Sequence, residues 1–288
     1  MTPPLDVRHI RRAFGRAATT YAQHAALQRE VEGRLLERLE YYRGQPARVL
    51  DVGCGTGRAS EALRKRFAPA QVIALDLALP MLRRVRIGWL RPLMRVCADA
   101  RGLPLPDASV DVLYSNLCVQ WVDDLPALFD EFRRVLKPGG YVALSTFGLD
   151  TLHELRSAWA AADDAPHVTA FAHIAQVGDA LMSAGFRDPV LDADHFTLTY
   201  ANAADLMHEL KALGATNADA RRARGLMGKS RYRHAVAAYE RFRHDGLLPA
   251  TYEVISAHAF APEAGQPRRS RGGEIASFSV EKLRGSRR

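Results

Sequence analysis

The stretch Val49-Leu50-Asp51-Val52-Gly53-Cys54-Gly55-Thr56-Gly57 constrains the fold of this chain more than any other. An apolar run typical of a buried strand leads through an acidic residue into three alternating glycines, and residues 58–67 then have the pattern of a helix. The glycines allow a sharp turn and let a ligand approach main-chain N–H groups that a Cβ atom would screen. Asp51 lies at the carboxyl end of the strand and is able to accept hydrogen bonds from a cationic amine. The pattern therefore predicts a strand, loop and helix that hold a ligand.

The spacing of the glycines separates two classes of cofactor site. The dinucleotide fingerprint would place its third glycine at position 58, which is Arg58 here, so nicotinamide binding is disfavoured. Asp-x-Gly-x-Gly-x-Gly instead resembles the first motif of class I S-adenosylmethionine-dependent methyltransferases. The resemblance implies S-adenosyl-L-methionine as cofactor and S-adenosyl-L-homocysteine as product. The residues that it assigns to the amino-acid end of the cofactor are Asp51, Gly53, Cys54, Gly55 and Gly57.

Later strands end in residues suited to the rest of this cofactor. The strand after the glycine helix ends at Asp76, 23 residues after Gly53, close to the spacing at which a carboxylate meets ribose hydroxyls. The third strand ends at Asp99, where related enzymes recognise the adenine amino group. The fourth ends at Asn116, on the edge where open α/β sheets bind ligands. The cofactor-binding residues predicted beyond the glycine loop are Asp76, Leu77, Met81, Asp99, Ala100, Asn116, Gln120 and Trp121.

The order of the remaining patterns predicts an α/β architecture. Strand and helix patterns alternate after the glycine loop, which indicates a Rossmann-like, seven-stranded, mostly parallel sheet with helices on both faces. We expect a helical lead over residues 1–46 and the methyltransferase domain over residues 47–262. A helical insertion over about residues 201–248 is expected to form a lid with the lead. Residues 263–288 form a basic tail rich in Arg, Gly and Ser.

Composition and charge exclude several classes of protein. The beginning of the chain has no apolar run of signal-peptide type, and no stretch approaches the roughly 18 uninterrupted apolar residues of a membrane span, so we expect a cytoplasmic protein. The three cysteines, Cys54, Cys97 and Cys118, are widely spaced, which suggests buried thiols and neither a disulfide framework nor a metal site. The net charge is +8, and the stretch from Arg221 onward holds 15 Lys and Arg against 6 Asp and Glu. This end is expected to be either a solvated tail or a surface that attracts an acidic partner.

Several stretches together resemble the malonyl-acyl-carrier-protein O-methyltransferases of biotin synthesis. The resemblance covers about Phe14 to Phe260. Its stretches are Phe14-Gly15-Arg16-Ala17-Ala18 with Tyr21 and His24-Ala25, Ser115-Asn116-Leu117 with Gln120-Trp121, Thr151-Leu152-x-Glu154-Leu155 with Ala158-Trp159, and Leu210-Lys211-x-Leu213-Gly214-Ala215-Thr216-Asn217. It implies transfer of a methyl group to the free carboxylate of malonyl-acyl carrier protein, which starts biotin synthesis. We expect a monomer that binds this carrier, without a nucleic-acid or membrane partner.

A second reading remains open on the residues alone. The stretch from Phe147 to Leu152 and the Arg/Gly-rich end are also similar to methyltransferase-fold assembly factors of respiratory complex I, for which arginine hydroxylation is proposed. Another small-molecule methyltransferase would share the glycine motif. A nucleic-acid amino-group methyltransferase is disfavoured because Ser115-Asn116-Leu117-Cys118 stands where its Asn-Pro-Pro-Tyr motif would lie.

The expected chemistry directs attention away from a general base. A carboxylate, with a pKa near 4, is already ionised at neutral pH and needs only to be positioned and desolvated. A tight bidentate arginine would reduce its nucleophilicity, so a hydroxyl or a looser cation suits the site better. Tyr21 in the lead is the first candidate for a hydrogen bond to the malonyl carboxylate, and Lys211 in the insertion is an electrostatic one. The face expected to dock the acidic carrier consists of Arg221, Arg222, Arg224, Lys229, Arg231 and Arg233.

Overall fold

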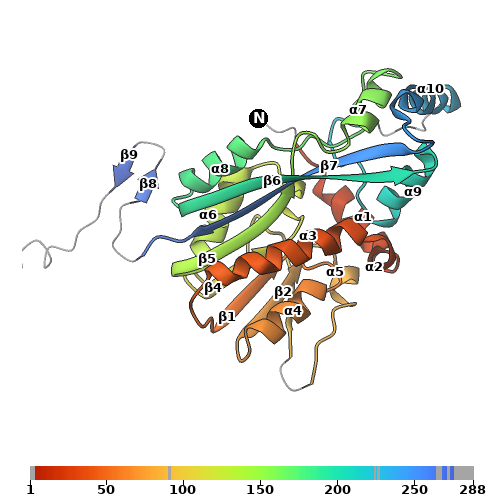
Figure 1. The fold of residues 1–288 in the computed structure, drawn as a ribbon. Helices are drawn as coiled ribbons and strands as arrows, with labels where there is room; N and C mark the ends of the chain where they lie inside the picture. The colour runs from red at the N-terminus through yellow and green to blue at the C-terminus, as the bar shows by residue number, and fades with distance from the viewer. Residues whose placement is uncertain are drawn as a thin grey trace, which may run out of the picture.

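The structure is a computed structural model that describes residues 4–89, 92–223, 225, 228–263, 268–270 and 273–275. Its centre is a seven-stranded sheet in the order β3-β2-β1-β4-β5-β7-β6 (Figure 1). Strand β7 runs antiparallel to both of its neighbours, and the other adjacent pairs are parallel. The predicted Rossmann-like methyltransferase fold is confirmed. The strands are β1 Arg48–Val52, β2 Gln71–Asp76, β3 Met94–Cys97, β4 Val110–Ser115, β5 Leu136–Phe147, β6 Arg187–Tyr200 and β7 Leu248–Phe260.

Ten α-helices and three short 3₁₀ helices occur among the described residues. The α-helices are α1 Val7–Ala17, α2 Tyr21–His24, α3 Ala26–Glu37, α4 Arg58–Arg66, α5 Leu79–Leu82, α6 Leu125–Val135, α7 His153–Ala160, α8 Ile174–Ser183, α9 Ala203–Ala212 and α10 Lys229–Tyr239. The 3₁₀ helices are η1 Arg38–Tyr41, η2 Val119–Trp121 and η3 Glu240–Phe242. Two short strands, β8 Arg268–Ser270 and β9 Gly273–Ile275, pair with each other in the predicted tail, whose other residues from 264 onward lie outside the described ranges.

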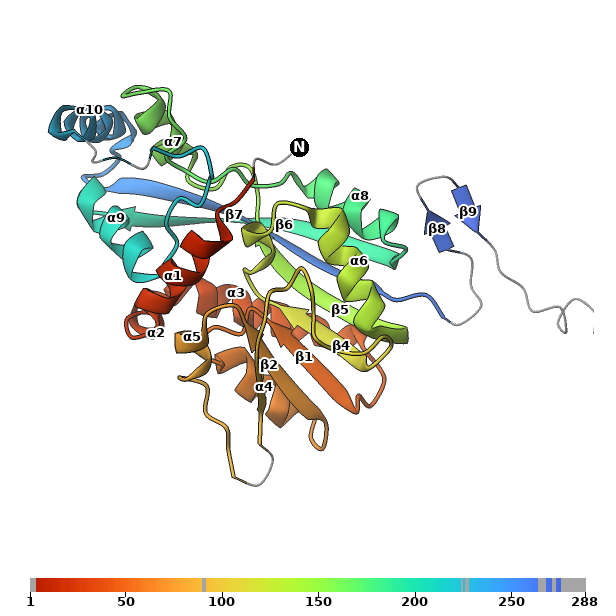
Figure 2. The same ribbon diagram turned by 180° about the vertical axis from the view of Figure 1, so that it is seen from behind.

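Successive side chains of the strands point to opposite faces of the sheet, and helices cover both faces, as in a doubly wound sheet. On one face, Val49 of β1 packs in a cluster with Leu35 of α3 and Leu63 of α4. On the other face, Leu50 packs with residues of α6 and α8, among them Phe129. Figure 2 shows α6 and α8 on that second face. The two cores hold the carboxyl ends of the parallel strands at one edge.

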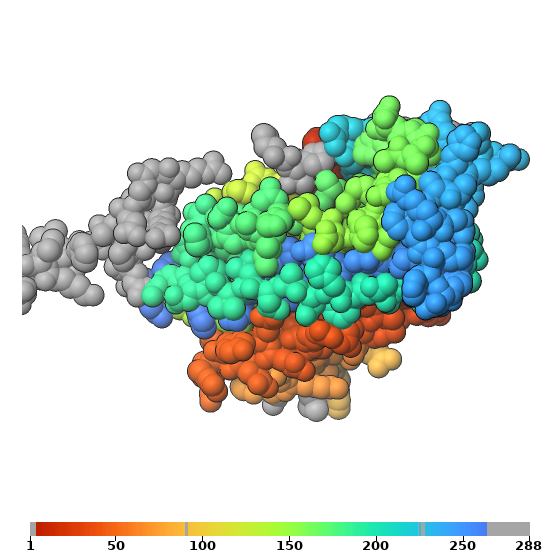
Figure 3. Space-filling view, turned by 45° about the horizontal axis from the view of Figure 1, so that its top comes forward, coloured from red at the N-terminus to blue at the C-terminus, as the bar shows by residue number. Residues whose placement is uncertain are grey.

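Strands β6 and β7 extend past that edge as a two-stranded ribbon. Pairing between β5 and β7 stops where Phe147 faces Val254, whereas β6 and β7 stay paired until Tyr200 faces Leu248. The overhanging part of the ribbon packs with residues of α7, α9 and α10 in one apolar cluster. The space-filling view shows α7 and α10 side by side at this end of the molecule (Figure 3).

We use the word roof for α1, α2, α7, α9 and α10 with residues 161–173 and 213–223. The loop that follows α9 connects the parts of the roof. Gly214 has a φ of +77°, and a Cβ atom there would lie 3.0 Å from the Cα atom of Phe14, so the loop contacts the backbone of α1 directly. Beyond it, Thr216 Oγ1 lies 3.0 Å from His9 Nε2, and the Asn217 side chain donates to the Pro166 carbonyl. The Leu-Gly-Ala-Thr-Asn stretch is therefore the joint between α1 and the segment around Pro166.

Two details differ from the sequence-based expectations. The stretch Lys137-Pro138-Gly139-Gly140 has the composition of a helix stop and turn, yet strand β5 begins at Leu136, because Leu136 already pairs with Val110 of β4. Cys97 is exposed, since β3 is an edge strand, so not all three thiols are buried. None of the helices among the described residues combines the length and the apolar character needed to cross a membrane.

Candidate functional site

The glycine loop is held against β2 by its own backbone. The N–H groups of Gly53 and Cys54 both donate to the Leu75 carbonyl, and Gly55 N–H donates to Asp76 Oδ2 at 2.9 Å. Gly53 has a φ of +73°, and a Cβ atom there would lie 2.5 Å from the Cβ and Sγ atoms of Cys118. Only glycine therefore lets the loop lie this close to the segment after β4.

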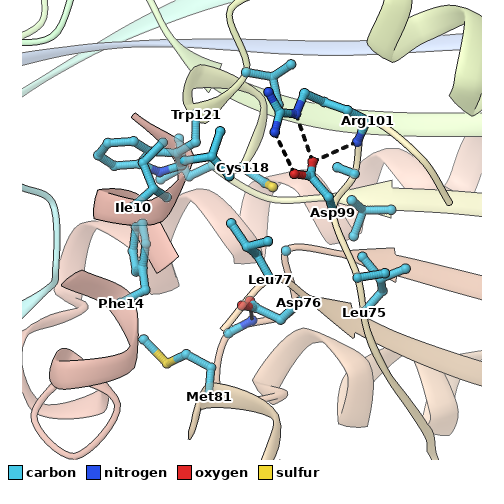
Figure 4. Close-up of a pocket in the computed structure, with 18 of the residues that line it drawn as sticks. Ile10, Phe14, Leu75, Asp76, Leu77, Met81, Asp99, Arg101, Cys118 and Trp121 are labelled. Atoms are coloured by element: carbon cyan, nitrogen blue, oxygen red, sulfur yellow. Dashed lines mark hydrogen bonds and ion pairs between the residues drawn. The ribbon is translucent and has the colours of Figure 1, made fainter. Parts of the chain in front are cut away.

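A cavity at the carboxyl ends of the strands lies beside this loop, and we call it the strand-end cavity. It encloses an empty volume of about 730 Å³, part of which is open to solvent. Figure 4 shows Leu75, Asp76 and Asp99 on its strand side and Ile10 and Phe14 of α1 across from them. The other predicted residues that line it are Tyr21, Gly53, Gly55, Leu77, Met81, Ala100, Asn116 and Trp121.

A second, smaller cavity lies on the other side of the loop, and we call it the glycine-loop cavity. Its empty volume is about 530 Å³, and Tyr21, Gly53, Gly55 and Asn116 line both cavities. Carboxylates and guanidinium groups share its wall. The carboxylates belong to Asp51 and Glu32, and the guanidinium groups belong to Arg29 and Arg58.

Both aspartates of the loop region are ionisable groups in unusual surroundings. Burial raises the pKa of Asp51 to about 7, although the side chain of Ser60 donates a hydrogen bond to it. Burial also raises the pKa of Asp76 to about 6, against the hydrogen bonds that it accepts from Ala78 N–H and Gly55 N–H. A cationic or hydroxyl-bearing ligand would offset this cost of desolvation, because it would pair with the ionised forms.

Glu32 adds a third carboxylate, from α3. It is 7% exposed and forms an ion pair of 3.1 Å with Arg58. Burial raises its pKa in spite of the nearby guanidinium groups of Arg58 and Arg29. On the same helix, Gln28 lines the cavity, and its Oε1 atom is buried without a hydrogen-bond partner. A buried acceptor of this kind costs free energy unless a donor reaches it, so this wall suits a ligand that carries N–H groups.

Asp99 is oriented by an arginine from its own loop. Arg101 donates from Nε to Oδ1 at 3.0 Å and from an Nη atom to Oδ2 at 2.7 Å (Figure 4). Burial alone would raise the pKa of Asp99, but these bonds outweigh it and hold the pKa below its ordinary value. Asp99 is therefore a fixed, ionised acceptor on the wall of the strand-end cavity.

Tyr21, at the start of α2, lies where the strand-end and glycine-loop cavities meet. Burial and the nearby charges of Asp76 and Glu32 raise the pKa of its phenol far above the ordinary value. The group therefore keeps its proton at any physiological pH and acts as a hydrogen-bond donor.

A third cavity lies under the roof, and we call it the roof cavity. It has an empty volume of about 1590 Å³, including space open to solvent. Much of its wall is apolar, with Phe147, Leu155, Phe171 and Tyr252 among its residues. Trp121 lines both this cavity and the strand-end cavity, and Phe14 packs edge-on against it with the ring centroids 5.2 Å apart. Trp121 is thus a wall residue that the two cavities share.

Three cations line the roof cavity, and they differ in their partners. Arg222 forms an ion pair of 2.9 Å with Asp6, and Arg231 lies 3.6 Å from Asp163. Lys211, at the end of α9, has no ion pair with any residue in the described part of the chain. An anion that enters this cavity would therefore meet one uncompensated positive charge.

The structure brings most of the predicted site residues together and leaves three apart. Lys211 lines only the roof cavity and is not among the residues around the glycine loop. Gly57 lies outside the three linings, and its positive φ serves the start of α4, where a Cβ atom would lie 2.7 Å from Val85. Gln120 is buried and donates to the Leu117 carbonyl, so it supports the segment after β4.

Sequence reasoning missed the wall that α3 supplies, namely Gln28, Arg29 and Glu32. A signal was present: Gln28 and Glu32 are four residues apart, so they form one row beside the apolar stripe of Leu27, Val31 and Leu35. Polar side chains in such a row flank a core, and here the row faces the loop.

The chain matches known proteins over nearly its whole length. A family model described as a methyltransferase domain matches residues 50–144. A protein of Xylella fastidiosa (strain M23), named malonyl-[acyl-carrier protein] O-methyltransferase, is 52% identical over 96% of this chain and 96% of its own length. A protein of the same name from Halorhodospira halophila is 48% identical over 99% of this chain and 97% of its own length.

Solved structures agree on the fold. A putative methyltransferase from Bacillus halodurans superposes with a TM-score of 0.58 at 18% identity, covering 80% of this chain and 98% of that one. The [4+2]-cyclase SpnF superposes with a TM-score of 0.52 at 19% identity, covering 82% of each chain. At such identities the likeness concerns architecture, whereas the relatives covered at 48–52% identity concern the family. The chain belongs to the malonyl-[acyl-carrier protein] O-methyltransferase family.

Proposed function

We propose that this protein transfers a methyl group from S-adenosyl-L-methionine to the free carboxylate of malonyl-acyl carrier protein, giving the malonyl methyl ester that starts biotin synthesis. The observation that carries the proposal is the meeting of a two-part strand-edge site with a separate roof cavity at Trp121. Family membership supports the choice of substrate, because the relatives carry that activity in their names.

The residues of the two smaller cavities fit the cofactor. Asp76, at the end of β2, is placed to accept from the ribose hydroxyls, and Asp99 and Ala100 to receive the adenine. Met81 packs within the same cavity and offers an apolar wall. When bound, S-adenosylmethionine supplies an electrophilic methyl group on its sulfonium.

The glycine-loop cavity suits the amino-acid end of the cofactor because it offers both signs of charge. Asp51 and Glu32 are able to accept from the ammonium group, and Arg29 and Arg58 are able to pair with the carboxylate. The unpaired Gln28 Oε1 is a further acceptor for that ammonium group. In this assignment α3 of the lead is part of the cofactor site.

The roof cavity suits the acceptor. Its apolar wall accommodates the uncharged thioester chain, and Lys211 offers an exposed cation for the terminal carboxylate. A single flexible ammonium group attracts the anion without the bidentate bonds that would stabilise it against reaction. The methyl ester that forms is neutral, so this attraction is lost in the product and favours its release.

The chain needs to hold and desolvate the acceptor and does not need to deprotonate it. The carboxylate is ionised at neutral pH, and fixing reactants in a dry, oriented pair is worth up to about 7–11 kcal/mol in favourable cases. The Tyr21 phenol lies where the two cofactor cavities meet and keeps its proton, so it orients the incoming carboxylate by donating a hydrogen bond. Trp121 and Phe14 pack edge-on in the wall of the strand-end cavity and offer an apolar cover for that place.

One experiment tests the proposal. The purified protein is incubated with S-adenosylmethionine and malonyl-acyl carrier protein, and the carrier is weighed by intact mass spectrometry. A gain of one methyl group on the malonyl carrier, with none on an acetyl carrier, is expected. No gain, with cofactor binding confirmed calorimetrically in the same preparation, would overturn the proposal in favour of an assembly or hydroxylase role.

A further inference from the structure

A dense basic surface lies outside the charge-rich end of the sequence. No Asp or Glu occurs between Asp6 and Glu30, nor between Asp76 and Asp99. The first stretch contains α1 and the second contains α5 and the loop after it. Their exposed arginines are Arg8, Arg11, Arg12 and Arg16 in α1, and Arg83, Arg84 and Arg86 after α5. We call these seven residues the α1–α5 surface.

The two stretches form one continuous surface because α1 packs on α5. Ala17 and Ala18 share an apolar cluster with Ala78 and Met81. The Arg84 side chain crosses between them and donates from Nε to the Ala18 carbonyl at 3.2 Å. Arginines that are some 70 residues apart in the sequence are thus held on neighbouring elements.

The charges of the α1–α5 surface are uncompensated, in contrast to those near the C-terminus. None of the seven arginines forms an ion pair with a residue that the structure describes. In the face expected from the sequence, by comparison, Arg221 pairs with Asp219, Arg222 with Asp6 and Arg231 with Asp163. Its other members are Lys229 and Arg233, without an ion pair among the described residues, and Arg224, which lies outside them. The stronger positive potential is therefore expected over α1 and α5.

Apolar side chains stand exposed in the same segment. Trp89 is 94% exposed, and Leu79 and Ile87 are 46% and 41% exposed. Such residues suit an acidic protein, which docks through charge at the rim and apolar contacts at the centre. Aromatic and arginine side chains are also the types that most often dominate binding energy.

The surface is close to the chemistry. The same α1 that carries four of the arginines presents Ile10 and Phe14 to the strand-end cavity and His9 to the roof cavity. A partner on the outer side of α1 is therefore separated from both cavities by about one helix diameter, roughly 10–12 Å. That distance is compatible with a flexible arm that carries the malonyl thioester inward.

We propose that the α1–α5 surface docks the acidic acyl carrier that presents the malonyl group. This inference rests on the proposed function, since it assumes a carrier-bound substrate. Steering by seven like charges raises the rate of encounter and makes it depend on ionic strength. The surface recognises the negative charge of the carrier protein. The methyl-transfer step itself does not depend on this docking contact.

The test compares a docked substrate with an undocked one. The double variant Arg11→Glu/Arg86→Glu is assayed with malonyl-acyl carrier protein and with malonyl-pantetheine, which has no carrier. We expect kcat/KM for the carrier substrate to fall about tenfold or more, as charge reversal at an interface rim does, with loss of its salt dependence. Turnover of malonyl-pantetheine and affinity for S-adenosylhomocysteine should stay unchanged.

A matched variant on the other face is Lys229→Glu/Arg233→Glu, which introduces the same change in charge at two exposed residues of α10. An equal loss in both variants, or a loss only in the α10 variant, would overturn the α1–α5 assignment. Tighter binding of duplex DNA than of the carrier by the wild-type protein would also overturn it. Absence of methyl transfer to either substrate by the wild-type protein would instead refute the proposed function.

Discussion

The glycine loop and the roof meet at the strand-end cavity but are built in opposite ways. The loop is a short run of consecutive residues whose N–H groups bond to the neighbouring strand, so its shape depends on local sequence. The roof joins α1 and α2 to α7, α9 and α10 through contacts between residues far apart in the sequence, among them the close approach of Gly214 to Phe14 and the contact of Thr216 with His9. Changes in the loop should therefore affect the cofactor, and changes in the roof should affect the acceptor.

The largest effect is expected in the loop. In Gly53→Ala the new Cβ atom would lie 2.5 Å from Cys118, at a φ of +73° that L residues rarely adopt. We expect affinity for S-adenosylhomocysteine to fall by about 100-fold, because the loop must move relative to Asp76. Isothermal titration calorimetry measures this, and Gly102→Ala, which has nothing within 4 Å, is the control. Unchanged affinity would show that the loop is as adaptable as the roof.

A substitution in the roof should lower the turnover rate and leave cofactor affinity unchanged. Tyr21→Phe removes one hydrogen-bond donor from the junction of the two cofactor cavities. We expect kcat to fall about 10- to 100-fold, the range for a hydrogen bond to a charged group, with affinity for S-adenosylhomocysteine unchanged. Steady-state kinetics with a saturating malonyl carrier provide the measurement. Wild-type kcat in this variant would remove Tyr21 from the chemistry.

The joint of the roof should matter less than the residues at the reaction centre. Gly214→Ala places a Cβ atom 3.0 Å from the α1 backbone and strains a φ of +77°. We expect about a tenfold loss in kcat/KM for the malonyl carrier, since the acceptor cavity shifts against α1. Gly228→Ala is the control, because nothing lies within 4 Å of that position. If cofactor affinity fell by the same factor, the loop and the roof would not be separable.

Glu32 sharpens the comparison, because it lies outside the loop and yet faces the cofactor. In Glu32→Gln one of two carboxylates near the proposed ammonium position is neutralised. We expect affinity for S-adenosylhomocysteine to fall about five- to tenfold, whereas 5′-methylthioadenosine, which lacks the amino-acid end, should bind as before. Glu30→Gln, on the exposed side of the same helix, should change neither affinity. Equal losses for both ligands would indicate a structural role for Glu32.

The smallest effect is a dependence on pH. Burial raises the pKa of Asp51 to about 7, so part of this carboxyl is protonated in the free protein below that pH. Binding of an ammonium group favours the ionised form, so affinity for S-adenosylhomocysteine should rise about fivefold from pH 6 to pH 7.5 and then level off. The same raised pKa means that the free protein loses stability as pH rises through this window. Asp51→Asn should flatten the binding profile, and a flat wild-type profile would contradict this account.

The same contrast explains how far the sequence could be read. Asp51, Asp76 and Asp99 were predictable because each lies at or within two residues of the carboxyl end of a strand, and parallel strands bring these ends to one edge. The roof cavity was not, because no periodicity tells which of several inserted helices face one another. Glu32 was missed because its row on α3 resembles an ordinary solvent-exposed flank.

The distribution of positive charge shows most clearly what could not be predicted from the sequence. Summed along the sequence, the positive charge gathers after Arg221, yet several of those arginines are neutralised in the folded chain. The arginines of the α1–α5 surface disappear in such a sum because acidic residues elsewhere in the first 220 positions cancel them. Only the packing of α1 on α5 brings them together. A partner responds to the spatial sum, which the sequence does not contain.

The overhanging ribbon of β6 and β7 has a consequence for how such a protein can diversify. Residues 201–247 leave the sheet at Tyr200 and return at Leu248, positions that face each other beyond the end of β5. Length and sequence in this segment can therefore change without moving any strand that holds the cofactor. If this segment receives the acceptor as proposed, substrate preference can change through it while the strands at the proposed cofactor site keep their places.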